Sequence, residues 1–136
     1  MNFILLSGGS GKRLWPLSND VRARQFIKIL KTEDEKYESM IQRVCRQIRK
    51  ADRNASITVS TSKAQVAAVH NQLEDTVNVC IEPSRRGTFS VIALTAAYLH
   101  DKKQLSLDDV VIICPIDPYV EDDYFTEVKK LEEVIK

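Results

Sequence analysis

Four short apolar runs alternate with longer segments of helical periodicity along the chain. The runs are NFILL (2–6), SITVS (56–60), VNVCI (77–81) and VVIIC (110–114). The first and the last are almost continuously apolar, which is typical of parallel strands covered on both faces. The pattern therefore predicts four strands of one sheet.

Helical patterns follow each of these runs. From Tyr37 to Ile48, apolar residues recur at the i, i+3, i+4, i+7 spacing of an amphipathic helix, with the charged residues off that face. A shorter helix is predicted over 62–73, with Ser62 as its N-cap. Residues 88–100 are apolar nearly all round, which indicates a helix buried against the sheet. The last segment places four apolar residues on one stripe, namely Phe125, Val128, Leu131 and Ile135.

The order of these elements predicts one α/β domain over residues 1–136. Alternating strands and helices imply crossover connections and a mostly parallel sheet with flanking helices. A chain of 136 residues, 43% of them hydrophobic, can build one ordinary core but not two. The chain stops in a helix with no strand after it, so we expect a truncated fold.

Charge and composition exclude several classes of protein. The net charge of +1 disfavours a general nucleic-acid-binding surface. No apolar run approaches the ~20 residues of a membrane span, and the start lacks the basic region of a signal peptide. Cys45, Cys80 and Cys114 lie far apart inside apolar segments, which indicates buried free thiols in a reducing compartment. We therefore expect a cytoplasmic protein with no membrane or nucleic-acid partner.

The positive charge gathers around a glycine-rich run, LLSGGSGKRLWPLS (5–18). Residues 1–31 hold six lysines and arginines against a single aspartate. The run follows a predicted strand, yet it lacks the spacing of a P-loop and of a dinucleotide-binding fingerprint. Successive backbone N–H groups of such a loop can still form a site for an anion. The run therefore predicts a phosphate-binding loop.

This run resembles the G-x-G-x-R-x-x-P-L-[ST] signature of sugar-phosphate nucleotidyltransferases, and its Trp-Pro pair is similar to the mannose-1-phosphate guanylyltransferase branch. Three further blocks resemble that branch in the same order, namely ARQFIKI (23–29), IEPSRRGTFSVIALTAAYL (81–99) and VIICPIDPYVEDDYF (111–125). The resemblance spans nearly the whole chain and implies a Rossmann-like α/β fold. It also implies transfer of GMP from GTP to mannose-1-phosphate, giving GDP-mannose and pyrophosphate with the help of Mg²⁺.

The resemblance implies roles for individual residues as well. It assigns catalysis to Arg13, Arg24 and Asp117, with Arg13 on the triphosphate and Asp117 as the Mg²⁺ ligand, a carboxylate that suits a hard cation. It assigns nucleotide binding to Leu6, Ser7, Gly8, Gly9, Gly11, Lys12, Arg13, Glu82, Pro83, Gly87 and Thr88. We expect Trp15 to pack beneath the glycine-rich run rather than to touch substrate.

Four positions depart from the family pattern. Ala23 replaces a proline, Arg24 a lysine, Gly87 an asparagine and Pro118 a histidine. These departures leave open a protein that binds nucleotide without turnover, and a nucleotidyltransferase for another sugar-1-phosphate. An RNA- or anion-binding module is a third alternative, but the interleaved aromatic residues of a single-strand platform are missing.

Two further expectations follow from the length of the chain. In the family, a second metal-binding aspartate and the mannose-binding residues lie beyond the region that this chain matches. We therefore expect the isolated chain not to complete the reaction. An uncovered sheet edge and apolar helix faces also lead us to expect self-association or marginal stability.

Overall fold

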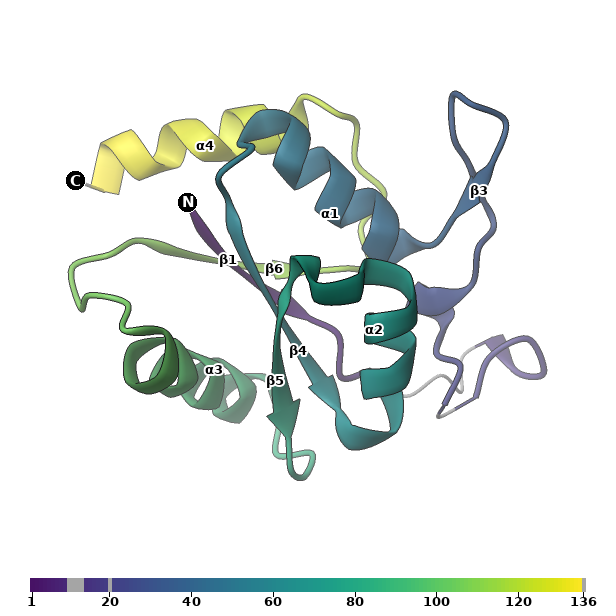
Figure 1. The fold of residues 1–136 in the computed structure, drawn as a ribbon, viewed down its shortest axis with the longest axis horizontal. Helices are drawn as coiled ribbons and strands as arrows, with labels where there is room; N and C mark the ends of the chain where they lie inside the picture. Colours follow the sequence, from purple (N-terminus) through teal and green to yellow (C-terminus); the bar gives the residue numbers. More distant parts are fainter. Residues whose placement is uncertain (10–13, 20, 136) are drawn as a thin grey trace.

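A four-stranded parallel sheet forms the centre of the molecule. The computed structural model describes residues 1–9, 14–19 and 21–135. The strands are β1 (Asn2–Leu6), β4 (Ser56–Ser62), β5 (Asn78–Glu82) and β6 (Val111–Pro115), in the order β5-β4-β1-β6. All neighbouring strands are parallel, with Asn2 opposite both Ser56 and Val111. The predicted α/β fold with a parallel sheet and flanking helices is confirmed (Figure 1).

Four α-helices connect and cover the strands. They are α1 (Met40–Ala51), α2 (Val66–Leu73), α3 (Thr88–Lys103) and α4 (Tyr124–Ile135). Short 3₁₀ turns occur at η2 (Arg24–Phe26), η3 (Lys63–Gln65) and η4 (Glu74–Thr76), and β2 (Leu30–Lys31) pairs antiparallel with β3 (Tyr37–Glu38). Within the described ranges, no helix is long and apolar enough to cross a bilayer.

Helix α1 begins later than the apolar pattern predicts, because a capping box fixes its start. The Ser39 side chain accepts from the backbone N–H of Gln42, and the Gln42 side chain accepts from the Ser39 N–H. Tyr37 was expected on this helix, but it lies in β3 and is exposed. Ser62 precedes η3 without a side-chain cap, so its predicted capping role is wrong.

The main core lies on the face of the sheet that α1, α2 and α4 cover (Figure 1). Alternate residues of β1 and β4 point into it, and each helix adds apolar side chains from its inner stripe. Phe125 of α4 packs edge-on against Phe3, with ring centroids 6.0 Å apart. The chief members are Phe3, Leu5, Ile41, Val44, Ile48, Ile57, Val59, Val69, Leu73 and Phe125.

Helix α3 lies alone on the opposite face of the sheet, and it is less buried than its apolar sequence predicts. Only Thr95 and Leu99 of this helix are buried, whereas Phe89 is 83% exposed. The all-round apolar sequence therefore meets the sheet along one narrow stripe. Likewise, Phe125 is the one buried residue of the apolar stripe on α4, and Leu131 and Ile135 are exposed. The three cysteines are buried and free, as predicted.

Candidate functional site

The candidate site lies at the carboxyl end of β1, where the later strands of the sheet lie on opposite sides of it. Strand β1 has β4 on one side and β6 on the other, so the loops after β1 and β6 leave the sheet next to each other. In open α/β sheets this crevice at the carboxyl ends of the strands is where ligands bind. The segments that follow β1, β5 and β6 all reach it, and each carries residues that the sequence singled out.

A first cavity of about 360 Å³ opens between the glycine-rich run and the end of β6. It is lined by Leu6, Gly9, Arg24, Gln25, Arg85, Pro115, Ile116 and Asp117. The Arg24 guanidinium donates to the Asp117 carboxylate across this cavity. The Asp117 side chain is 58% exposed, so the ion pair is open to solvent and to an incoming ligand. This cavity therefore combines a cation and a carboxylate at one opening.

A second cavity of about 320 Å³ lies on the other side of the same loop. Its lining consists of Leu6, Gly8, Gly9, Glu82, Arg85, Gly87, Thr88 and Val91. Because Leu6, Gly9 and Arg85 line both cavities, the two meet over the backbone of the glycine-rich run. An elongated ligand with a charged end and a planar end would fit such a pair.

Two buried glutamines fix the backbone on either side of Gly8. Gln25 donates to the carbonyl oxygen of Ser7 at 3.0 Å, and Gln65 donates to that of Gly9 at 3.0 Å. The two amide groups also contact each other, with Gln25 Nε2 3.4 Å from Gln65 Oε1. The carbonyl oxygens of the loop are therefore held by the protein rather than directed toward a ligand.

Arg85 holds the third carbonyl of this loop. Its Nε and Nη2 donate to the oxygen of Gly8 at 3.2 and 2.6 Å. The backbone N–H groups of Gly8 and Gly9 donate to no acceptor among the residues that the structure describes. Two backbone donors thus remain for an anion, and they lie near the guanidinium groups of Arg24 and Arg85, whose present partners are Asp117 and the Gly8 carbonyl.

A carboxylate forms part of the wall of the second cavity. Glu82 is only 9% exposed, and its Oε2 lies 2.9 Å from the place where a Cβ on Gly8 would stand. Real Cβ atoms essentially never come this close to another atom. Gly8 is therefore required for the close approach of Glu82, and its φ does not lie in the left-handed region. Gly87 has φ +89°, a conformation that favours glycine at the turn before α3.

The structure brings most of the singled-out residues together. Those that line one or both cavities are Leu6, Gly8, Gly9, Arg24, Glu82, Gly87, Thr88 and Asp117. Ser7 lies behind the loop and is buried, and Pro83 lines a separate hollow beside Arg86. Gly11, Lys12 and Arg13 lie outside the described residues. Trp15 is 77% exposed, so the expectation that it packs beneath the run is wrong.

Sequence reasoning missed three residues that shape the site, namely Gln25, Gln65 and Arg85. Gln25 and Gln65 are buried, and a buried amide in a small domain generally has hydrogen-bond partners to satisfy. No local spacing predicts that they meet, since they come from η2 and η3. Arg85 stands within the 81–99 block, but only its contact with Gly8 separates it from an ordinary exposed arginine.

A divalent cation would find one carboxylate here. Among the described residues, no group of three or more histidine, cysteine, aspartate or glutamate side chains is placed to hold a metal. Mg²⁺ is usually bound by one or two carboxylates together with substrate phosphates and waters. Asp117, exposed at the opening of the first cavity, fits the role of a single protein ligand.

Known proteins provide an independent comparison. Residues 2–134 match the sequence profile of the family described as Nucleotidyl transferase. The alginate biosynthesis protein AlgA of Pseudomonas aeruginosa is 30% identical over 123 residues, covering 88% of this chain and 24% of that protein. The mannose-1-phosphate guanylyltransferase RfbM of Salmonella typhimurium is 26% identical over 135 residues, covering 96% and 27%. The chain thus spans about a quarter of the length of these curated relatives.

Solved structures show the same fold. A Thermus thermophilus protein described as a mannose-1-phosphate geranyltransferase matches with a TM-score of 0.71 at 22% identity, over 96% of this chain and 36% of that one. A putative glucose-1-phosphate thymidylyltransferase from Bacillus anthracis matches with a TM-score of 0.72 at 18% identity, over 98% and 50%. The fold is thus Rossmann-like, as the resemblance implies. Since the family profile covers almost every residue, the chain belongs to the nucleotidyl transferase family.

Proposed function

We propose that this chain forms the nucleotide-binding part of a sugar-1-phosphate nucleotidyltransferase that transfers GMP from GTP to mannose-1-phosphate. The observation that carries the proposal is the pair of cavities that meet over one glycine-rich loop. One cavity has guanidinium groups and an exposed carboxylate, and the other has a buried carboxylate in its wall. The name of RfbM supports mannose-1-phosphate and a guanine nucleotide as the substrates.

The first cavity suits the phosphates. In the proposed reaction, a phosphate oxygen of the sugar-1-phosphate attacks the α-phosphorus of GTP, and the bond to pyrophosphate breaks. Two polyanions must approach each other, so positioning and charge neutralisation supply most of the catalysis. Arg24, Arg85 and Gly9 line this cavity, and we assign to their guanidinium and backbone N–H groups the binding of phosphate oxygens. When bound, Mg²⁺ supplies further positive charge, and Asp117 is the residue that would hold it.

The second cavity suits a guanine base. Guanine presents two adjacent donors, N1–H and the exocyclic amino group, which a carboxylate accepts together. Adenine presents a lone pair on N1 at the matching place, which a carboxylate repels. Glu82, held in the cavity wall against Gly8, provides such a carboxylate. A site that is built to accept hydrogen bonds rejects a ligand that cannot donate them.

Calorimetric titration with GTP and ATP in the presence of Mg²⁺ tests this proposal. We expect GTP to bind at least about tenfold more tightly than ATP, since one lost charge-assisted hydrogen bond is worth about 1.5–3 kcal/mol. Glu82→Gln should remove the preference by weakening GTP alone. Ser84→Ala provides a matched control, because Ser84 lines neither of the two cavities. Equal binding of all four nucleoside triphosphates would refute the assignment of guanine.

The acceptor and the transfer step are tested separately. Release of pyrophosphate from GTP should require mannose-1-phosphate, and glucose-1-phosphate should support it poorly. This assay uses a protein of the full length of the relatives, since the chain spans about a quarter of them. Binding of GTP without release of pyrophosphate would favour a protein that only binds nucleotide.

A further inference from the structure

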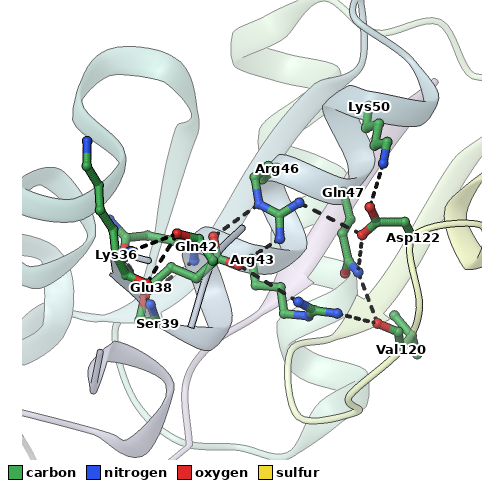
Figure 2. A network of polar contacts seen from close by, with 11 residues as sticks. Lys36, Glu38, Ser39, Gln42, Arg43, Arg46, Gln47, Lys50, Val120 and Asp122 are labelled. Carbon is green, nitrogen blue, oxygen red and sulfur yellow. Dashed lines mark hydrogen bonds and ion pairs between the residues drawn. The ribbon is translucent and has the colours of Figure 1, made fainter. Parts of the chain in front are cut away.

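The connection from β6 to α4 carries Asp117 but has no regular secondary structure over residues 117–121. Helix α1 holds this connection at three successive points. The Arg43 guanidinium stacks over the Tyr119 ring, with its carbon 4.3 Å from the ring centroid. The carbonyl oxygen of Val120 accepts from Arg43 and from Gln47, each at 3.0 Å, and the Asp122 carboxylate accepts from Gln47 at 3.0 Å (Figure 2).

Two more cationic side chains of α1 contact the Asp122 carboxylate. Lys50 donates to the Asp122 carboxylate at 2.6 Å, and an Arg46 nitrogen lies 3.8 Å from it. Arg46 also forms a bidentate pair with Glu38, at 2.7 and 3.1 Å (Figure 2). The contacting residues follow one another along one side of α1, so a single rigid helix holds the whole connection.

Arg43 and Gln47 lower the stability of the fold relative to apolar residues at the same positions. Both are buried on α1, and neither Arg43 Nε nor Gln47 Oε1 has a hydrogen-bond partner among the described residues. The nearest carboxylate to Arg43 is that of Glu38 at 3.9 Å, which Arg46 binds more closely. A buried cation with incomplete pairing lowers stability, and an apolar residue would pack there at less cost. What Arg43 and Gln47 contribute in return for this loss of stability is the fixed path of the Tyr119–Asp122 backbone.

The fixed path extends back to Asp117 through Pro118. The proline ring locks its own φ near −65° and also restricts the residue before it. The Asp117 side chain is mostly exposed, and its ion pair is with the partly exposed Arg24. Its place in the first cavity therefore depends on the backbone held at Tyr119 and Val120, rather than on burial of the carboxylate.

We propose that Arg43 and Gln47 are positioning residues, which act through Tyr119 and Val120 to place Asp117 for the metal-bound triphosphate. The proposal rests on the role proposed above for Asp117. Neither residue lines the cavity that contains Asp117, so each acts without touching substrate.

Arg43→Met tests the proposal, because it keeps an unbranched apolar stem and removes the guanidinium. The affinity for GTP is measured by calorimetry with Mg²⁺ and again with EDTA. We expect the ratio of the two affinities to fall at least about tenfold, since a displaced Asp117 carboxylate loses its charge-assisted contact with the bound cation. The affinity in EDTA should change less than about twofold. A purely structural loss would lower both affinities together and leave their ratio unchanged.

Arg49→Met is the matched control, since Arg49 lies on the same helix and donates to the carbonyl oxygen of Thr76 at 2.7 Å. It should leave the ratio unchanged. Backbone order parameters from NMR relaxation give a second readout that does not depend on nucleotide. The order parameters of Tyr119–Asp122 should fall from about 0.85 in the wild type to below about 0.6 in Arg43→Met, and should be unchanged in Arg49→Met.

Each other outcome overturns the proposal. Unchanged order parameters would show that α1 does not hold the connection, and lower order parameters with an unchanged ratio would show that holding it does not place Asp117. A wild-type ratio near one would refute the metal role of Asp117 itself, which separates the two failures. Should Arg43→Met not fold, Tyr119→Ala replaces it, because Tyr119 is exposed and its removal leaves the core intact.

Discussion

Gly8→Ala should destabilise the protein only while Glu82 keeps its carboxylate. The added Cβ would stand 2.9 Å from Glu82 Oε2, whereas an ordinary contact begins at 3.4 Å. The carboxylate must therefore move by a few tenths of an ångström, and as the end of a side chain it can do so by leaving its rotamer. Such a rotation costs about 0.5–1.5 kcal/mol, and the loss of freedom in the unfolded chain offsets about 0.4–1 kcal/mol of it, so we expect Gly8→Ala to reduce the free energy of unfolding by only a few tenths of a kcal/mol.

In a Glu82→Ala background the same change meets no carboxylate. Since the φ of Gly8 is not in the left-handed region, alanine can adopt the backbone conformation. The loss of freedom in the unfolded chain should then stabilise the protein by about 0.4–1 kcal/mol. The unfolded-chain term is the same in both backgrounds, so the coupling energy equals the rotamer cost of Glu82, about 0.5–1.5 kcal/mol.

Urea unfolding of the four proteins in a double-mutant cycle, followed by circular dichroism, measures this coupling. Gly9→Ala is the control, because no atom lies within 4 Å of its added Cβ and its stability should not depend on residue 82. Additive effects of Gly8→Ala and Glu82→Ala would refute the close approach of the carboxylate to the loop. No nucleotide is needed, so the result is independent of the proposed function.

Three other changes have defined outcomes. Asp117→Asn should weaken GTP binding in Mg²⁺ at least about tenfold. It should lower Tm without ligand by only ~1–2 °C, because an exposed ion pair is worth about 0–1 kcal/mol. A large drop in Tm would show that Asp117 has a structural role. Burial raises the pKa of the Cys45 thiol to about 12, although the nearby Arg49 charge opposes the shift. A disulfide reagent at pH 8 should therefore label this thiol only after unfolding. Rapid labelling of the native protein would contradict the raised pKa. The hydrogen bonds from Lys50 and Gln47 lower the pKa of Asp122 below its ordinary 3.8, so its stabilising contribution is present above that value and is lost as the pH falls through the lowered one. Asp122→Asn should flatten this acid loss of Tm, and an unchanged acid profile would argue against the ion pair.

The strands were predictable because their signal is local. Continuous apolar runs such as 2–6 and 110–114 predict buried parallel strands, and each strand of the four-stranded sheet lies within two residues of its predicted bounds. The short strands β2 and β3 were not predicted. The start of α1 was missed for an equally local reason. Tyr37 happens to extend the apolar spacing of the helix, and the Ser39-x-x-Gln42 capping box that ends this extension was overlooked.

The environment of α3 could not be predicted in the same way. An all-round apolar sequence shows that a helix can be buried, but the sheet supplies only one surface for it, and Phe89 faces solvent. The contacts of the loop carbonyls are equally hidden. The glycine-rich motif indicates Gly8 and Gly9. The side chains that bind their carbonyl oxygens belong to Gln65 and Arg85, which come from distant segments and are not marked by any sequence periodicity.

Strand β1 sets the order in which this chain can fold. It precedes the other strands of this chain, yet Asn2 pairs with Ser56 on one side and with Val111 on the other. Contacts so distant in sequence require the closure of long loops before they return any free energy, which slows folding. A nascent chain that has not reached Val111 has one side of β1 unpaired, an exposed edge that invites association with other chains. Synthesis of β6 is therefore the step that covers this side of β1.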